Sequence, residues 1–285
     1  MKKLMITATV ALCAAVGSQA LESANVVGYT TREMGNTFKI AAAQFESTAG
    51  LTQKINDFVA CQNPGQVWEG DMEDYEERAG WKDSAPTIQV PVASGGYNYY
   101  FYVSDARIDD TTGTLGWATS GGDYVTVGEI AAGLGLWIRG ANDGVNDTTT
   151  FTFSGQVISD DSATISGDGT FRLRASPYPK ATLLNGENVA DWSVLTPGQA
   201  WEGDMADYEE RAGWKDSAPQ IQVPVASGGY NYYFYVTDAR VDDDNGTLGW
   251  ATAGGDYATT AVIPAGVGIW FKANTAAATD IEFYK

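Results

Sequence analysis

The sequence predicts an all-β protein made of two tandem homologous β-sandwich-like (or small barrel) domains, with one or two short helices each. Three observations support this prediction. Short segments rich in Tyr, Phe, Trp, Val and Thr alternate with Gly, Asp and Asn turns. Helical spacing of apolar residues is confined to short stretches. The chain also repeats itself at a spacing of 133 residues.

The chain begins with a predicted signal peptide over residues 1–20. Lys2 and Lys3 precede an apolar run, and Ser18 and Ala20 supply the small residues of a cleavage site. The run is shorter than the ~20 apolar residues that a membrane-spanning helix needs. We therefore expect export to the extracellular space or cell surface, with the periplasm as an alternative. We expect no transmembrane segment after cleavage.

The repeat predicts a β domain over residues 21–152 and a second copy over residues 153–285. Residues 68–124 and 201–257 differ at only seven of 57 positions, and we align the copies without a gap from Thr37 and Thr170 onward. The segments that flank this block keep only about a quarter of their residues. The near-identity indicates either one surface used twice or recent recombination between the copies.

Alternation of side chains predicts the strands. In "YNYYFYV" (97–103), one face is predicted to carry Tyr97, Tyr99, Phe101 and Val103, and the other face Asn98, Tyr100 and Tyr102. Further strands are predicted in the segments "IQVPV", "GTLGWAT", "GLGLWIRG", "TTTFTFSGQV", "GTFRLRA", "GVGIWFKA" and "DIEFYK". A short helix is predicted around residues 51–59, and the acidic segment 71–80 fits a helix or a loop.

Several of these segments carry a resemblance. The start "ESANVVGYT", the "GTLGWAT…GGDY" stretch, the strand "AGLGLWIR" with its copy "AGVGIWFK", and "TFSGQV" resemble a group of exported, duplicated all-β bacterial proteins. Mature chains of that group open with S-A-N-V-V-G-Y. The resemblance implies architecture and export, and it supplies no active residues.

Composition limits the chemistry. The formal net charge of −19 and the sequence pI near 4.2 disfavour binding to nucleic acid. The absence of histidine excludes Ser-His-Asp and Cys-His catalysis and His-ligated zinc. Cys61 follows an apolar run, so we expect a core residue and not a nucleophile.

Clustered aspartates give a calcium hypothesis. Carboxylates in a Gly-containing turn suit a hard cation, although the spacing is not that of an EF-hand. A solvated hairpin turn is the simpler interpretation. The predicted metal residues are Asp105, Asp109, Asp110, Asp238, Asp242, Asp243 and Asp244.

Aromatic residues beside the acidic segment give a glycan-binding hypothesis. Exposed Tyr and Trp can stack on sugar rings while polar neighbours bind hydroxyls. Aromatic sandwich cores explain the same pattern. The predicted contacts are Trp68, Trp81, Tyr100, Tyr102, Trp201, Trp214, Tyr233 and Tyr235. A third hypothesis, a carboxylate-based glycosidase that uses acids such as Glu69 and Asp71, is the least favoured.

We therefore expect a non-enzymatic exported protein with a structural or adhesive role at the cell surface or in the extracellular matrix. Exposed strand edges could join copies head to tail, and two equivalent domains would give avidity. Its partner would be a second copy or an extracellular glycan. The main alternative is a bivalent glycan-binding module, with calcium as the one cofactor to test.

Overall fold

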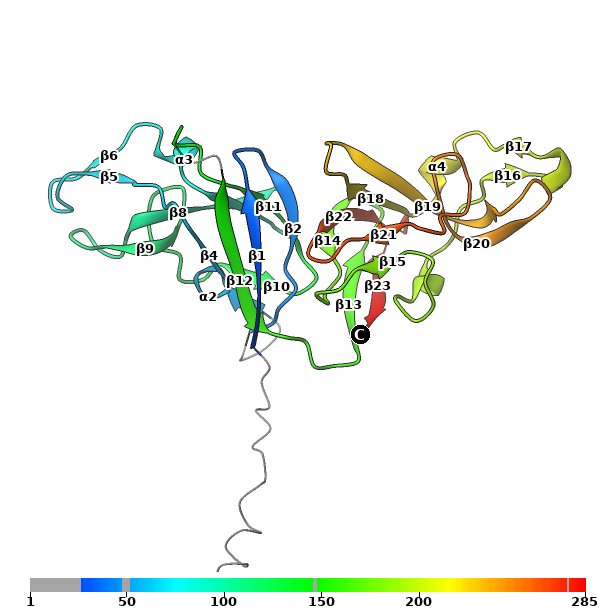
Figure 1. Ribbon diagram of the computed structural model, residues 1–285, viewed down its shortest axis with the longest axis horizontal. Helices are drawn as coiled ribbons and strands as arrows, with labels where there is room; N and C mark the ends of the chain where they lie inside the picture. Colours follow the sequence, from blue (N-terminus) through cyan, green and yellow to red (C-terminus); the bar gives the residue numbers. More distant parts are fainter. Residues whose placement is uncertain (1–26, 48–51, 146–147, 276) are drawn as a thin grey trace, which may run out of the picture.

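The computed structural model describes residues 27–47, 52–145, 148–275 and 277–285. The predicted signal peptide and the first residues after it lie outside this range. The described chain forms two halves, residues 27–156 and 158–285, which lie side by side (Figure 1). Within these residues no helix has the length and apolarity needed to cross a membrane.

The first half consists mainly of short strands, which alternate with turns rich in Gly, Asp and Asn. Its elements are β1 (Val27–Met34), β2 (Lys39–Ala42), β3 (Thr52–Lys54), α2 (Ile55–Phe58), β4 (Val59–Cys61), β5 (Trp68–Glu69), β6 (Glu76–Glu77), α3 (Trp81–Ser84), β7 (Thr87–Pro91), β8 (Tyr97–Arg107), β9 (Gly113–Ala118), β10 (Glu129–Ala131), β11 (Gly135–Arg139) and β12 (Thr149–Gln156).

The second half has a similar series of elements. They are β13 (Ser162–Gly167), β14 (Arg172–Ala175), β15 (Thr182–Leu183), η1 (Trp192–Val194), β16 (Trp201–Glu202), η2 (Met205–Asp207), β17 (Glu209–Glu210), α4 (Trp214–Ser217), β18 (Gln220–Pro224), β19 (Tyr230–Arg240), β20 (Gly246–Ala251), β21 (Val262–Ile263), β22 (Gly268–Lys272) and β23 (Thr279–Tyr284).

Each half contains one five-stranded antiparallel sheet, and the two sheets have the same topology. The orders are β2-β11-β7-β8-β9 and β14-β22-β18-β19-β20. The registers also agree, since Tyr99 pairs with Gln89 and Tyr232 pairs with Gln222. The all-β, sandwich-like prediction with short helices is confirmed. Whether each half is an independent domain stays a prediction.

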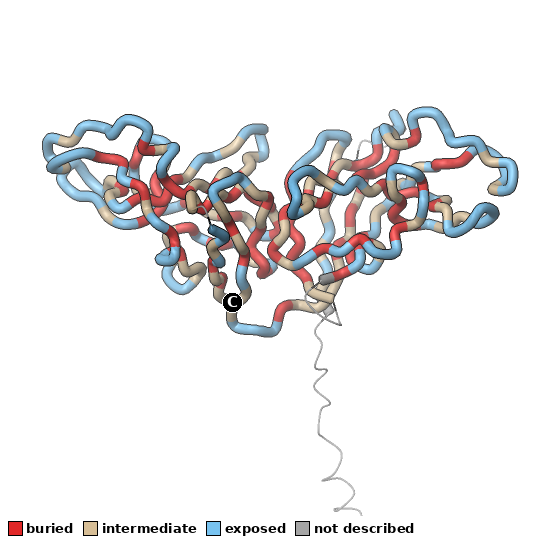
Figure 2. Tube along the Cα trace, turned by 180° about the vertical axis from the view of Figure 1, so that it is seen from behind, coloured by how far each residue is buried: buried red, intermediate tan, exposed pale blue. Residues whose placement is uncertain are grey.

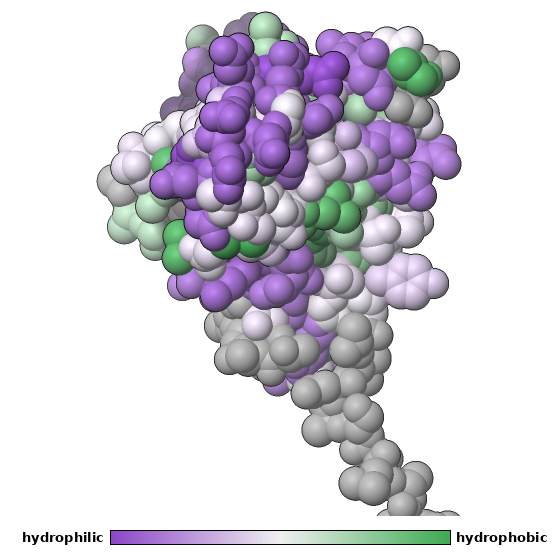
Figure 3. Space-filling view, turned by 90° about the vertical axis from the view of Figure 1, so that its left-hand side faces the viewer, coloured by the Kyte–Doolittle hydropathy of each residue, from purple (hydrophilic) through white to green (hydrophobic). Residues whose placement is uncertain are grey.

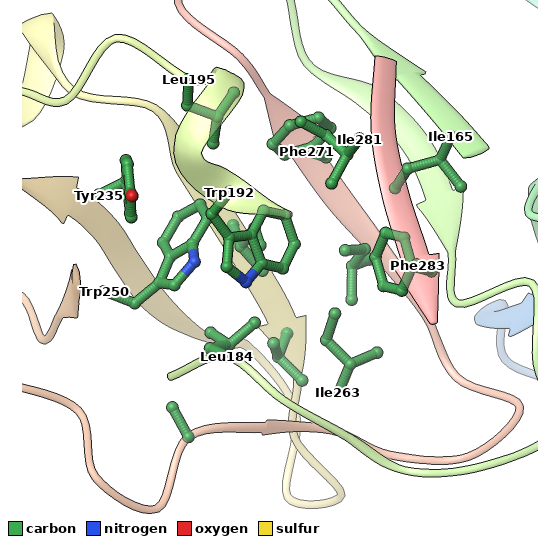
Figure 4. Packing of buried hydrophobic residues seen from close by; sticks show 14 of the residues in the cluster. Ile165, Leu184, Trp192, Leu195, Tyr235, Trp250, Ile263, Phe271, Ile281 and Phe283 are labelled. Atoms are coloured by element: carbon green, nitrogen blue, oxygen red, sulfur yellow. The ribbon is translucent and has the colours of Figure 1, made fainter. Parts of the chain in front are cut away.

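One face of each five-stranded sheet forms the sandwich core of its half. In the first half this face packs against the sheet β1-β12-β4, and Trp117 lies 6.3 Å from Phe151 between ring centroids. In the second half, β13-β23 and η1 occupy that position, and Trp192 packs edge-on to Trp250 at 5.1 Å (Figure 4). Burial of such side chains stabilises the fold by about 1.5–3 kcal/mol each. Figure 2 shows buried segments through the middle of each half and exposed turns around them.

The opposite face of each five-stranded sheet, here called the second face, is covered by a hairpin and a short helix near the far end of each half. There the short hairpin β5–β6 and helix α3 pack on Phe101 and Val103. The hairpin β16–β17 and helix α4 do the same in the second half, over Phe234 and Val236. We call these regions, with the β8–β9 and β19–β20 hairpins, the outer ends.

The two halves meet through an approximate two-fold arrangement, here called the junction. The Ala42 amide donates to the Gly266 carbonyl at 2.9 Å, and the Ala175 amide donates to the Gly133 carbonyl at 2.8 Å. These two hydrogen bonds are equivalent, because the repeat spacing of 133 residues relates Ala42 to Ala175 and Gly133 to Gly266. The junction is therefore isologous in form, as in a two-fold symmetric dimer.

Glycine is required where the strands cross at the junction. A Cβ on Gly268 would lie 2.3 Å from the Ile40 side chain and 2.8 Å from the Ala41 carbonyl oxygen. A Cβ on Gly135 would lie 2.9 Å from the Arg174 carbonyl oxygen. This close approach gives a physical reason for the repeated Gly-x-Gly-x-aromatic segments.

The structure corrects two details of the repeat. The predicted boundary between residues 152 and 153 falls inside β12, all of which pairs with β1. The gapless alignment is also wrong in the flanks. Asn56 bonds the Trp117 amide, and Asn185 bonds the equivalent Trp250 amide, although these asparagines are 129 residues apart. The number of residues before each asparagine can differ between the copies, because the asparagine needs only to reach the edge strand, β9 or β20.

Candidate functional site

Each outer end is held by an arginine that lies over an aromatic pair. The Trp68 and Tyr75 rings are 4.0 Å apart between centroids, and the Arg107 guanidinium lies 5.3 Å from the Trp68 ring. Arg107 also bonds the Tyr75 hydroxyl and donates from Nε to the Asp123 carboxylate at 2.7 Å. These bonds, first to Asp123 and then to Tyr75, raise the pKa of Arg107.

The second outer end repeats this clamp. Trp201 and Tyr208 are 4.2 Å apart, and the Arg240 guanidinium lies 5.3 Å from the Trp201 ring. Arg240 bonds Asp256 at 2.7 Å and also the Tyr208 hydroxyl. The near-identical sequence block therefore builds the same local structure at opposite extremities of the molecule (Figure 1).

The aromatic residues predicted to contact a glycan lie mainly in the interior. Tyr100 and Tyr233 are half-buried beside the sandwich cores. The indole N–H groups of the α3 and α4 tryptophans are used internally, and Trp81 donates to Glu77 at 2.7 Å. Their faces are not available for stacking on a sugar. The buried members are Trp68, Trp81, Tyr102, Trp201, Trp214 and Tyr235.

Several of the predicted metal residues accept hydrogen bonds within the fold, and the others lie in exposed turns. Asp105 accepts hydrogen bonds from the Val67 and Trp68 amides at 2.9 and 3.1 Å, and Asp238 does the same for Ala200 and Trp201. No cluster of three or more His, Cys, Asp or Glu side chains suited to a metal occurs among the described residues. The turn residues Asp109, Asp110, Asp242, Asp243 and Asp244 are exposed.

The acidic hairpins present an open carboxylate surface and no enclosed acid pair. Glu69 and Glu77 are exposed and form long ion pairs with Arg78 and Lys82, at 3.7 and 3.8 Å. Ion pairs of this kind contribute about 0–1 kcal/mol. In Figure 3, which views this end, hydrophilic side chains cover the upper part and separate hydrophobic patches lie below.

Apolar side chains are exposed at equivalent positions of both outer ends. Ile108 and Leu115 flank the β8–β9 turn and are 60% and 54% exposed. Their counterparts Val241 and Leu248 are 59% and 52% exposed. Position 108/241 is one of the seven that differ within the block, and it remains apolar in both copies.

A groove lies between the halves, beside the junction, and we call it the junction groove. Its volume is about 660 Å³, and the turn between β18 and β19 lies across from the start of β2. Two of its lining residues, Phe38 and Trp137, project from the second face of the first sheet. Its lining residues include Arg32, Phe38, Lys39, Ile40, Trp137, Ser227, Gly228, Gly229 and Tyr230.

Strand register explains how these side chains come together. Trp137 pairs with both Ile40 and Gln89, and residues opposite each other in an antiparallel sheet point to the same face. Across the junction, Trp137 meets its own counterpart Trp270 edge-on, with 6.3 Å between ring centroids. The Trp137 ring is half-buried.

The lining of the junction groove includes Arg32 and Lys39 and contains no aspartate or glutamate. Lys39 pairs with Ile138, so its side chain lies on the face of β2 opposite to Phe38 and Ile40. Arg32 donates to the Ala265 carbonyl at 2.9 Å, and burial lowers the pKa of its guanidinium. Lys39 is exposed and has no ion pair or hydrogen bond within the described residues.

Sequence reasoning missed the junction groove because its parts are distant in the chain and unremarkable one by one. Phe38, Trp137 and Tyr230 come from three segments and two halves. The repeated Gly-x-Gly-x-aromatic segment was the available signal, since close strand crossing there places Trp137 at the surface.

Comparison with known proteins gave no match to a family, to a curated protein or to a solved structure.

Proposed function

We propose that this is an exported, non-enzymatic structural or adhesive protein of the cell surface or extracellular matrix, which self-associates through its two outer ends. The observation that supports this most is the pair of near-identical surfaces at opposite extremities of the molecule (Figure 1). Export rests on the predicted signal peptide.

The outer ends are suited to binding because they are stiff and partly apolar. The arginine clamp orders each hairpin, so little conformational entropy is lost on contact. Ile108 and Leu115 at one end, and Val241 and Leu248 at the other, offer apolar surface surrounded by acidic side chains. Exposed apolar residues within a polar rim are typical of protein contact sites.

Two equivalent ends would make the molecule bivalent. If one end binds an end of another copy, each added copy leaves a free end, and the assembly grows as a chain. Association through strand edges, which we expected from the sequence, has less support. The inner edges β2 and β14 meet at the junction, and at the β9 edge Asn56 and Val125 bond the Trp117 backbone.

A bivalent glycan-binding module remains the alternative, but not with the aromatic residues first predicted. Most of those are buried, so they cannot stack on a sugar ring. Carboxylate-based glycoside hydrolysis has no supporting feature beyond exposed acids, which usually form a solvated surface.

Light scattering over a concentration series tests the proposal. The wild-type protein should form larger particles as concentration rises, whereas the double variant Leu115→Ser with Leu248→Ser should stay monomeric. Val127→Ser is the matched control, because Val127 is 80% exposed and lies outside the near-identical block. A wild-type protein that stays monomeric at every concentration would refute self-association, and equal assembly of all three proteins would show that the outer ends are not the contact.

A further inference from the structure

The turn between β19 and β20 carries an acceptor sequence for N-linked glycosylation. Asn245, Gly246 and Thr247 form the motif Asn-x-Thr, which oligosaccharyltransferases recognise in exported proteins. The motif occurs once more in the chain, at Asn146, which lies outside the described residues. Such a motif needs to lie in an exposed turn, because the attached sugar is bulky and hydrated. The β19–β20 turn, at the second outer end, meets this condition (Figure 1).

The asparagine of this motif is accessible in the folded protein. Asn245 and Gly246 are exposed, and Thr247 is half-buried in β20. The Asn245 side-chain amide donates to the two carboxylate oxygens of Asp242, at 2.9 and 3.2 Å. Asp242 is itself exposed in the same turn. Rotation of the Asn245 side chain therefore frees its amide without opening the fold.

The first outer end has the same turn without the motif. The Ile108 amide donates to the Thr112 carbonyl at 2.9 Å, as the Val241 amide does to the Asn245 carbonyl at 3.0 Å. Thr112 therefore has the position of Asn245 on an equivalent backbone. Positions 111 and 112 are two of the seven at which the near-identical block differs, and the difference gives the motif to the second copy alone.

A carboxylate stands before the motif where bacterial oligosaccharyltransferases need one. These enzymes accept an asparagine when Asp or Glu lies two residues before it, and Asp243 has that position. Asp243 is exposed, so a transferase can reach it. Asn146 has Gly144 at the same position and does not meet the requirement. Because the chain resembles exported bacterial proteins, this requirement selects Asn245.

We propose that Asn245 is the acceptor of an N-linked oligosaccharide. The Asn245 side-chain nitrogen forms a bond to C1 of the first sugar of a lipid-linked oligosaccharide diphosphate. The bond from C1 to the diphosphate oxygen breaks, the lipid diphosphate leaves, and the amide loses one proton. This inference rests on the export that we propose for the protein, and it does not depend on self-association.

A glycan at Asn245 would close one of the two outer ends. Val241 and Leu248, the exposed apolar side chains of this end, stand on either side of Asn245 in the same hairpin. A bulky, hydrated sugar covers such a surface. If copies associate through their outer ends, the glycosylated protein keeps one open end and should stop at dimers, whereas the unmodified protein should form longer chains.

Mass spectrometry of the exported protein tests the site. The full chain, with Asp-Asp-Asn-Gly-Thr added after Lys285, is expressed in bacteria together with a bacterial oligosaccharyltransferase and its lipid-linked oligosaccharide. The added tail repeats residues 243–247, so a glycan on it reports export and transfer. We expect one oligosaccharide on the tail and one on the tryptic peptide 241–272, in which Asn245 is the only asparagine.

Matched variants locate the acceptor. Asn245→Gln, Thr247→Ala and Asp243→Asn should each lose the glycan of peptide 241–272 and keep that of the tail. Thr247→Ser should keep both, because serine also completes the motif. Thr112→Asn should add a glycan to the equivalent turn of the first outer end, where the neighbouring residues complete the same motif.

Two results would overturn the proposal. One is a glycosylated tail on a protein whose Asn245 is unmodified, and the other is a glycan on peptide 241–272 that survives Asn245→Gln. Sedimentation velocity of the glycosylated protein and of Asn245→Gln then separates the modification from self-association. If both proteins are monomers, self-association is refuted and the acceptor site stands, and if both form equally long chains, the glycan does not close an end.

Discussion

Basic residues at the outer ends and around the junction have different partners. At the outer ends every one forms an ion pair with a carboxylate, namely Arg78, Lys82, Arg107, Arg211, Lys215 and Arg240. Around the junction, Arg32, Lys39 and Arg174 have no such pair among the described residues, whereas Arg172 has one. Arg32 and Arg174 donate to backbone carbonyl groups instead, of Ala265 and Leu173, at 2.9 Å each.

The outer ends and the junction also differ in symmetry. The outer ends are the same on both halves down to the arginine clamp, which suits a task done twice. The junction is two-fold in its backbone hydrogen bonds but not in its side chains, since Lys39 faces one side and the paired Arg172 the other.

The largest expected effect is at the strand crossing of the junction. Gly268→Ala puts a methyl group against backbone of β2, which cannot move without shifting both sheets, so we expect a loss of about 3 kcal/mol of unfolding free energy. Urea denaturation measures it. Gly121→Ala is the control, because the nearest atom to its new Cβ would be 3.5 Å away, and it should cost little. Equal stability of the two variants would mean that the junction is looser than described.

The clamp of the outer end should have the next largest effect. Arg107→Leu removes hydrogen bonds to Asp123 and Tyr75 and the contact with Trp68, so we expect a loss of about 1–2 kcal/mol in the same urea experiment. Arg78→Gln, whose ion pair is long and exposed, should cost less than about 0.5 kcal/mol. If both cost the same, the clamp does not stiffen the outer end.

Low pH should remove the stabilisation that the ion pair between Asp168 and Arg172 gives to the second half. Hydrogen bonds from Thr170, then from Arg172, lower the pKa of Asp168 to about 2. A lowered folded-state pKa stabilises the fold above the unfolded value near 3.8, and this contribution is lost as pH falls from there toward 2. After allowance for solvent screening, the Asp168→Asn variant should therefore have an unfolding free energy on the order of 1 kcal/mol below that of the wild-type protein at pH 5. Near pH 2 the difference should be small. Thermal melts at both pH values measure this, and a loss that is the same at both would rule out the ion pair as its source.

Salt should have the smallest effect. Raising sodium chloride from about 0.05 to about 0.5 M should strengthen self-association, because it screens repulsion between acidic outer ends. Sedimentation velocity follows this response. Weaker association at the higher salt concentration would mean that attraction between charges, and not apolar contact, holds the copies together.

The sequence predicted much of the fold, but it predicted little about which side chains are exposed to solvent. Alternation in residues 97–103 correctly divided the side chains between two faces of β8. It could not show that both faces are covered, Tyr102 by the sandwich core and Phe101 by the outer-end hairpin. Trp68 and Trp81, beside many acids, therefore looked like surface residues although they are interior.

The candidate groove was harder to predict for a related reason. A local pattern can mark a strand or a turn, whereas Phe38 and Tyr230 become neighbours only when the halves meet.

The equivalence of the outer ends is tested most directly by sedimentation velocity of two single-end variants, Leu115→Ser and Leu248→Ser. Each retains one intact outer end, so each should stop at dimers, and the two dimers should have the same dissociation constant while the wild-type protein forms longer chains. If one variant stays monomeric and the other assembles like the wild type, only one outer end makes the contact, and the two ends are not equivalent.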